Sequence, residues 1–303
     1  MNELNPSKSV VERYIYAATA GNTRLAYQSH VRSYEATGGP LPATPSDLTL
    51  WAIEKVKTCK MSTIEAQMFG IKKWHLLNGL PDPTDSIELK TIIKGMRRTH
   101  GTKKRKAKAL TLDQILQVCE LWTDTIVNVR DAAVVSIGFF GALRRSELAS
   151  LMISNLEWTP EGLLLTLPRS KTDQTGEGYI KGIPYRNETC PLAPLRRWLE
   201  LSGIKSGPLF RPISRHGPMG DGLLGDKSIN RIVKKAACAL GLDPSGYSGH
   251  SLRRGLATAA SHAGASREDI KRQGNWKSEK VLDGYIQEGN VFTSNVINTI
   301  IRN

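Results

Sequence analysis

The chain has 303 residues, of which 40% are hydrophobic, and its 42 Lys and Arg outnumber its 28 Asp and Glu to give a net charge of +14. The longest nearly apolar run, residues 132–143, is too short for a transmembrane helix, which needs about 20 residues. Composition therefore argues against a membrane protein. The excess of positive charge favours a polyanionic partner, most simply nucleic acid, although a merely solvated basic surface is the alternative.

Cysteine and histidine spacing points to chemistry without a metal. The four cysteines form no C-x-x-C pair, and the six histidines lack the clustered spacing of metal ligands. We therefore expect no disulfide framework, no metal and no cofactor. The first 18 residues carry charges and no long apolar segment, which favours a cytoplasmic, nucleoid-associated protein over a secreted one.

Residues 1–100 are expected to form a helical domain. Asn22 is predicted to cap a helix that ends before residues 38–40, and Thr44 with the following proline begins a helix near 48–57. Residues 62–65, Ser-Thr-Ile-Glu, predict a capping box for a third helix that ends near residue 79. Ser86 begins the fourth helix.

The segment 94–110 is strongly basic and has no acidic residue. Like charges repel one another and resist packing, so residues 101–109 are predicted to be an interdomain linker. Such a linker could be a solvated connector, or it could neutralise phosphates along a duplex.

Residues 110–303 are expected to form a second domain, mainly α with a small antiparallel sheet, so that the whole chain is of the α+β class. A capping box at residues 111–114 begins one helix, and an apolar helix over 132–140 ends at Gly141. Residues 162–171 and 179–185, joined by a turn-rich segment, predict a hairpin. The remaining helices are predicted at 192–202, 228–240, 251–262, 267–273, 278–286 and 292–301.

The chain lacks the phosphate-binding loop, the dinucleotide-binding glycine motif and the nucleophile elbow of serine hydrolases. What remains is a series of cationic and hydrogen-bonding residues near predicted turns. Each has an ordinary structural explanation when taken alone: Arg144 and Glu147 as a helix-surface ion pair, Lys171 as a solvated turn residue, Trp276 as a core anchor and Tyr285 as helix packing.

The order and spacing of these residues are more informative than any one of them. LRRSELASL follows an apolar helix, a hairpin lysine comes next, and then His-x-x-Arg, a Trp 23 residues after that Arg and a Tyr nine residues after the Trp. This series resembles the active site of the tyrosine recombinases, and the Trp at the fifth position is similar to the Cre-like branch. The resemblance extends over the whole chain, because residues 22–39, 62–85 and the basic linker resemble the family's helical core-binding domain.

The resemblance implies a role for each matching residue. Tyr285 would attack a scissile phosphate to form a 3′-phosphotyrosyl link, Arg144 and Arg253 would hold the non-bridging oxygens, and Lys171 would protonate the leaving 5′-oxygen. The phosphate pocket would be completed and oriented by His250, Trp276 and Glu147. Two guanidinium groups can neutralise a developing phosphorane bidentately, which agrees with the lack of a metal-ligand cluster.

The resemblance also implies double-stranded DNA with a short inverted-repeat recombination site as partner, and a homotetramer on two such sites. Its C-terminal exchange helix, residues 291–303, would dock on a neighbouring protomer, with docking in cis as the alternative. The candidate DNA-binding residues, which could equally belong to solvated surfaces, are Ser62, Gln67, Lys73, Lys103, Arg105, Lys227, Asn230 and Arg231.

The alternative functions are a type IB topoisomerase-like enzyme and a non-cleaving, sequence-specific DNA-binding protein. The biological role could be integration and excision, or resolution, of a DNA element.

Overall fold

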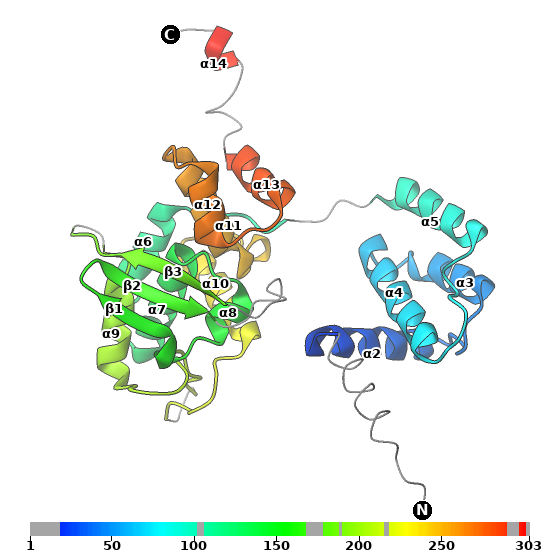
Figure 1. Ribbon diagram of the computed structural model, residues 1–303, viewed down its shortest axis with the longest axis horizontal. Helices are drawn as coiled ribbons and strands as arrows, with labels where there is room; N and C mark the ends of the chain where they lie inside the picture. Colours follow the sequence, from blue (N-terminus) through cyan, green and yellow to red (C-terminus); the bar gives the residue numbers. More distant parts are fainter. Residues whose placement is uncertain are drawn as a thin grey trace, which may run out of the picture. The chain divides into compact units, whose positions relative to one another are not determined.

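The computed structural model describes residues 19–101, 106–167, 178–187, 190–214, 218–289 and 297–300. The chain divides between residues 105 and 106 into two compact units, and this division falls within the basic segment (Figure 1). In the described part of the chain, no helix combines the length and the apolar character needed to cross a membrane.

The N-terminal unit is helical, as expected, and its core is formed where its helices meet (Figure 1). Tyr34, Leu48, Ile64 and Ile71 are completely buried there. The helices are α2 (Gly21–Glu35), α3 (Pro45–Lys55), α4 (Met61–Leu77) and α5 (Ile87–His100).

Two of the four predicted helix starts in this unit are confirmed and two are wrong. Thr44 forms a capping box with Asp47, and the Ser86 side chain caps α5. By contrast, α2 begins after Ala20 rather than at Asn22, and α4 begins after Lys60. The carbonyl of Lys60 already accepts hydrogen bonds from two backbone amides of the first turn, so the predicted capping box at 62–65 lies inside the helix.

The second unit is built around α7 (Ile126–Phe140), which is buried along most of its length and packs against α6, α9, α10 and α11. The predicted capping box at Thr111 is confirmed, and Gly141 ends α7 as expected. The other helices of this unit are α6 (Leu112–Leu121), α8 (Arg145–Ala149), α9 (Ala193–Ser202), α10 (Asp226–Ala239), α11 (His250–His262), α12 (Arg267–Gly274), α13 (Glu279–Gly289) and α14 (Ile297–Ile300). Two short 3-10 turns, Ile153–Asn155 and Pro244–Gly246, complete the list.

The sheet has three antiparallel strands in the order β1-β2-β3 (Figure 1). The predicted hairpin is confirmed as β2 (Gly162–Leu167) and β3 (Tyr179–Pro184), whereas β1 (Leu156–Thr159) was not predicted. Leu163 and Leu165 of β2 point into the core, opposite Ile183 and Lys181 of β3. A lysine therefore occupies a position of β3 that alternation would give to an apolar residue.

Candidate active site

The turn after α7 positions the first candidate arginine. Gly141 ends the helix, Ala142 adopts a positive φ of 46°, and Arg144 directly precedes α8. Glu147, in the first turn of α8, accepts a hydrogen bond from the Arg144 backbone amide at 2.8 Å and pairs with its guanidinium. Burial opposes ionisation of Glu147, but these bonds and the charge of Arg144 lower the pKa of Glu147 below its ordinary value.

The second arginine comes from α11 and is almost completely buried. Arg253 is 4% exposed, and its Nη1 donates to the carbonyl oxygen of Ala142 at 2.6 Å. Its guanidinium carbon lies 4.2 Å from the ring centroid of Trp276, a cation–π contact. Burial, followed by the charge of Arg144, lowers the pKa of Arg253 to about 10, so the group still carries its charge at neutral pH.

Trp276 and Tyr285 lie beside this arginine. Gly274 ends α12, and a Cβ added there would lie 1.8 Å from the Trp276 ring, so the ring folds back directly onto the glycine. The ring centroids of Trp276 and Tyr285 are 6.0 Å apart at an angle of 66°. Arg254 is also near, with its guanidinium carbon 5.6 Å from the Tyr285 ring centroid. The tyrosine ring thus contacts both an aromatic neighbour and a cation.

His250 begins α11 and is exposed at the surface of the unit. Crowding by neighbouring atoms, followed by the charges of Arg145, Arg253 and Arg144, lowers the pKa of His250. At neutral pH its imidazole is therefore mainly uncharged and able to accept a proton. The preceding Gly249 amide donates to Asn230 Oδ1 of α10 at 2.8 Å, which fixes the start of α11.

Comparison with known proteins places this arrangement in a family. Residues 108–290, more than half of the chain, match the phage integrase family. The chain belongs to this family. It is 34% identical to an integrase/recombinase XerD homolog of Selenomonas ruminantium over 85% of this chain and 77% of that protein. It is also 24% identical to the Cre recombinase of Escherichia phage P1, over 81% and 76% of the two chains.

Solved structures show the same fold. A lambda integrase (75–356) dimer bound to a COC′ core site has a TM-score of 0.63 at 16% identity, and the match covers 92% of this chain and 94% of that one. A XerH site-specific recombinase in a post-cleavage complex with palindromic difH substrate has a TM-score of 0.62 at 13% identity, with 92% and 78% covered. The chain is a tyrosine recombinase, an enzyme of site-specific DNA recombination, as the sequence motifs had indicated.

The recombinase brings six of the seven candidate active-site residues together. Arg144 and Glu147 meet at the start of α8, Arg253 lies over the Trp276 ring, and Trp276 meets Tyr285 edge to face. The sixth residue, His250, lies within the electrostatic influence of both arginines. The seventh candidate, Lys171, lies outside the described residues.

Sequence reasoning missed a second lysine at this site. Lys181 of β3 is 2% exposed, and its Nζ donates to the backbone carbonyls of Gly141 and Ala142. Arg253 donates to the same Ala142 carbonyl. Burial, followed by the charge of Arg253, lowers the pKa of Lys181 to about 7. The only sequence signal was its alternation with Tyr179 and Ile183 along the strand, and that signal also fitted an outward-facing lysine.

The candidate DNA-binding residues of the N-terminal unit have different environments. Ser62 is exposed, and Lys73 is half-buried with its ammonium 5.6 Å from the Phe69 ring centroid. The expectation that Gln67 faces outward is wrong: its side chain is 7% exposed, and its Nε2 donates to Ser33 Oγ of α2 at 2.9 Å. The face of α4 that carries Gln67 packs against α2.

On α10, Lys227 and Arg231 are exposed, and Arg231 donates to Ser228 of the same helix. Asn230 is half-buried, and its Oδ1 is occupied by the Gly249 amide. Two further candidates, Lys103 and Arg105, lie outside the described residues.

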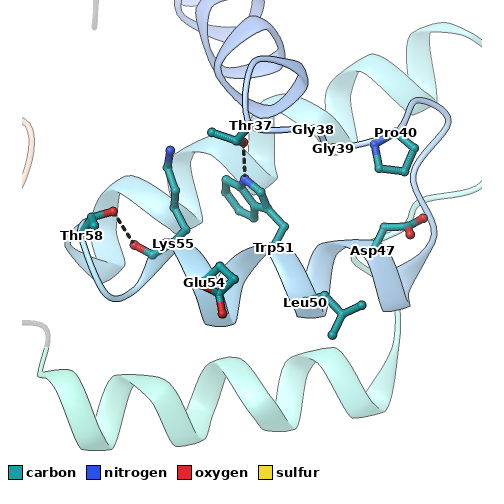
Figure 2. Close-up of a pocket in the computed structure, with 10 residues that line it drawn as sticks. All are labelled: Thr37, Gly38, Gly39, Pro40, Asp47, Leu50, Trp51, Glu54, Lys55 and Thr58. Atoms are coloured by element: carbon teal, nitrogen blue, oxygen red, sulfur yellow. Dashed lines mark hydrogen bonds between the residues drawn. The ribbon is translucent and has the colours of Figure 1, made fainter.

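A hollow in the N-terminal unit is lined by none of these residues (Figure 2). It is lined by residues 37–40 of the loop after α2, by α3 and by Thr58, and Trp51 Nε1 donates to Thr37 Oγ1 at 3.1 Å. The lining includes two acidic residues, Asp47 and Glu54, and a single lysine, Lys55, so this hollow does not suit a polyanion. Within the described ranges, no group of three His, Cys, Asp or Glu residues is placed to hold a metal ion.

Proposed function

We propose that this recombinase cleaves and rejoins DNA through Tyr285. The phenolic oxygen attacks the scissile phosphorus, the bond to the 5′-oxygen breaks, and a 3′-phosphotyrosyl link and a free 5′-hydroxyl remain. The phenol loses its proton and the leaving 5′-oxygen gains one. Reversal of the same step by a 5′-hydroxyl of a partner strand rejoins the DNA, so neither ATP nor a metal is consumed.

The observation that carries this proposal is the contact of Trp276 with both Arg253 and Tyr285, with Arg144 close by. Burial, followed by the charge of Arg144, lowers the pKa of Arg253, and a phosphate bound by both groups would offset the repulsion between them. Charge that develops on the non-bridging oxygens would then be met by preorganised guanidinium donors, of which Arg253 is almost completely buried. Glu147 orients Arg144 through its bonds to the backbone amide and the guanidinium.

Proton transfer is assigned to the two remaining candidates. The uncharged imidazole of His250 accepts the proton of Tyr285, directly or through water. Lys171 is proposed to protonate the leaving 5′-oxygen.

The substrate is proposed to be double-stranded DNA with a short inverted-repeat site, bound by a homotetramer on two sites. Residues 1–100 would clamp the duplex together with the basic linker 101–109 and exposed α10 residues such as Lys227 and Arg231. The DNA-bound states of the lambda integrase and XerH structures support double-stranded DNA as the substrate.

We further infer a cytoplasmic, nucleoid-associated enzyme that acts in integration and excision, or in resolution, of a DNA element. The mass of the complex on a paired-site DNA tests the tetramer, and a stable monomer or dimer there would exclude it.

A covalent adduct tests the proposed chemistry. The full chain is incubated with DNA from its own genetic neighbourhood, the products are separated on a denaturing gel, and the modified peptide is identified by mass spectrometry. We expect an adduct on Tyr285, its loss in Tyr285→Phe, and unchanged DNA binding by that variant. Binding without an adduct in the wild type would contradict the cleavage reaction, and relaxation of plasmids without a specific site would indicate a topoisomerase.

A further inference from the structure

Three consecutive backbone carbonyls follow the last turn of α7, and each is bound by a side chain from a different element. The Phe140 carbonyl accepts from Gln273 Nε2 of α12 at 2.9 Å, and the Gly141 carbonyl accepts from Lys181 Nζ of β3 at 2.6 Å. The Ala142 carbonyl accepts from Arg253 Nη1 of α11 at 2.6 Å. Helix ends leave such carbonyls without helical partners, and here they become the point at which three elements converge.

Lys181 makes more of these contacts than the other two side chains. Besides Gly141, its Nζ donates to the Ala142 carbonyl at 3.4 Å, so it shares an acceptor with Arg253. It also donates to the Gln273 carbonyl at 2.7 Å, and Gln273 Nε2 returns a hydrogen bond to the Gly182 carbonyl at 3.2 Å. In its ammonium form Nζ has three protons, and its three hydrogen-bond partners are all carbonyl oxygens.

These contacts reach two of the segments that carry the proposed phosphate-binding residues. The turn at Ala142 leads to Arg144 two residues later, and Gln273 lies three residues before Trp276. Ala142 has a left-handed backbone, which is unfavourable for a residue with a Cβ and needs its surroundings to hold it. Lys181 is therefore the one side chain in the described part of this site that bonds both to the turn and to the end of α12.

We propose that Lys181 is a positioning residue for the cleavage reaction, whose Nζ fixes the turn that carries Arg144 against the end of α12 that leads to Trp276. The inference rests on the proposed function. This role differs from the general-acid role proposed for Lys171, because the hydrogen bonds of Lys181 Nζ all go to backbone carbonyls. Its effect on catalysis passes through the placement of the arginines and the tryptophan.

Lys181→Met tests this, since methionine is similarly long and unbranched but has neither charge nor donor. With a suicide DNA substrate under single-turnover conditions, we expect cleavage to slow by ~100-fold, the scale associated with a misplacement of about 1 Å. Gel-shift binding should change by less than about threefold, because the exposed DNA-contacting groups are untouched. Lys205→Met, which removes an exposed lysine of the same unit, is the matched control and should cleave at the wild-type rate.

A second substrate separates positioning from acid catalysis. When the 5′-bridging oxygen is replaced by sulfur, the leaving thiolate departs without needing a proton, so loss of a general acid is compensated. We expect Lys181→Met to remain slow on the sulfur substrate while Lys171→Met recovers. Recovery of Lys181→Met would overturn the inference and make this lysine the acid, and a wild-type rate for Lys181→Met on ordinary DNA would overturn it as well.

Two further measurements keep the test decisive. If Lys181→Met fails to unfold cooperatively, Gln273→Met replaces it, because Gln273 is only half-buried and its loss breaks the bonds to Phe140 and Gly182. It should show the same slow cleavage on both substrates, and a wild-type rate would overturn the inference. An absence of cleavage by the wild type, by contrast, would refute the proposed function rather than the role of Lys181.

Discussion

The lysine on β3 gives the most quantitative expectation for this protein. Burial first, and then the charge of Arg253, lowers the pKa of Lys181 from 10.5 to about 7, with Arg144 acting in the same direction and Glu147 opposing it. The neighbouring Tyr179 ring, whose centroid lies 5.4 Å from the ammonium, completes the charged or titratable surroundings on β3. In NMR spectra of protein labelled at the lysine Cε, one resonance should titrate near neutral pH and should be missing from Lys181→Met.

The same shift makes folding stability depend on pH. Between about pH 7 and 10.5 the unfolded chain binds a proton on Lys181 that the folded chain does not, so the free energy of unfolding rises with pH across this window. The slope approaches about 1.4 kcal/mol per pH unit. Between about pH 7 and 9 the wild type should therefore gain about 2 kcal/mol relative to Lys181→Met.

Urea denaturation of the full chain at these two pH values measures that gain. The transition that differs between the two proteins belongs to the second unit, because Lys181 lies there. A stability difference that is the same at both pH values, or a lysine spectrum in which every resonance titrates near 10, would refute the reasoning.

Two further substitutions have defined outcomes. Glu147→Gln keeps the shape of the side chain but leaves Arg144 without its buried counter-ion, so the free energy of unfolding should fall by up to about 3 kcal/mol in urea denaturation. Unchanged stability would show that this ion pair contributes nothing. Gly274→Ala places a Cβ 1.8 Å from the Trp276 ring and should displace it, slowing single-turnover cleavage by ~10- to 100-fold. Gly222→Ala, which has nothing within 4 Å of the added atom, is the control and should cleave normally; equal rates for the two variants would contradict the packing argument.

The sequence predicted the parts of the fold that depend on local signals. The hairpin was visible from its alternation and its turn-rich connection, and the starts of three helices were visible from Thr44, Ser86 and Thr111. The start of α4 was misplaced because Ser62 to Glu65 also satisfies the capping pattern one residue inside a helix. Strand β1 was missed because its exposed centre shows no alternation between buried and exposed positions.

The candidate site, like the fold, could be predicted only in part. Arg144, His250, Arg253, Trp276 and Tyr285 could be named because their order along the chain is distinctive. The contacts among these residues could not be predicted, because the cation–π contact of Arg253 with Trp276 depends on how α11 and the end of α12 pack.

Two side chains show that a sequence pattern alone does not decide whether a polar residue faces the core or the solvent. Lys181 is charged, and charged residues are rarely buried without partners, so its inward position could not be told from an outward one. The partners are carbonyls about 40 and 92 residues away in sequence. Gln67 presents the opposite case, because a polar residue on an amphipathic helix was placed outward although it faces α2.

The short segment just before α6 has a practical consequence for dissecting the enzyme. Residues 106–109 lie within the predicted linker, yet the Lys108 amide donates to the Gly246 carbonyl at 2.8 Å and the Leu110 amide to that of Ser251 at 3.3 Å. Arg254, which lies against Tyr285, donates to the Ala107 carbonyl at 2.7 Å. A fragment meant to isolate the cleaving half must therefore begin no later than Lys106, because one that starts at the first turn of α6 removes a carbonyl that holds this arginine in place.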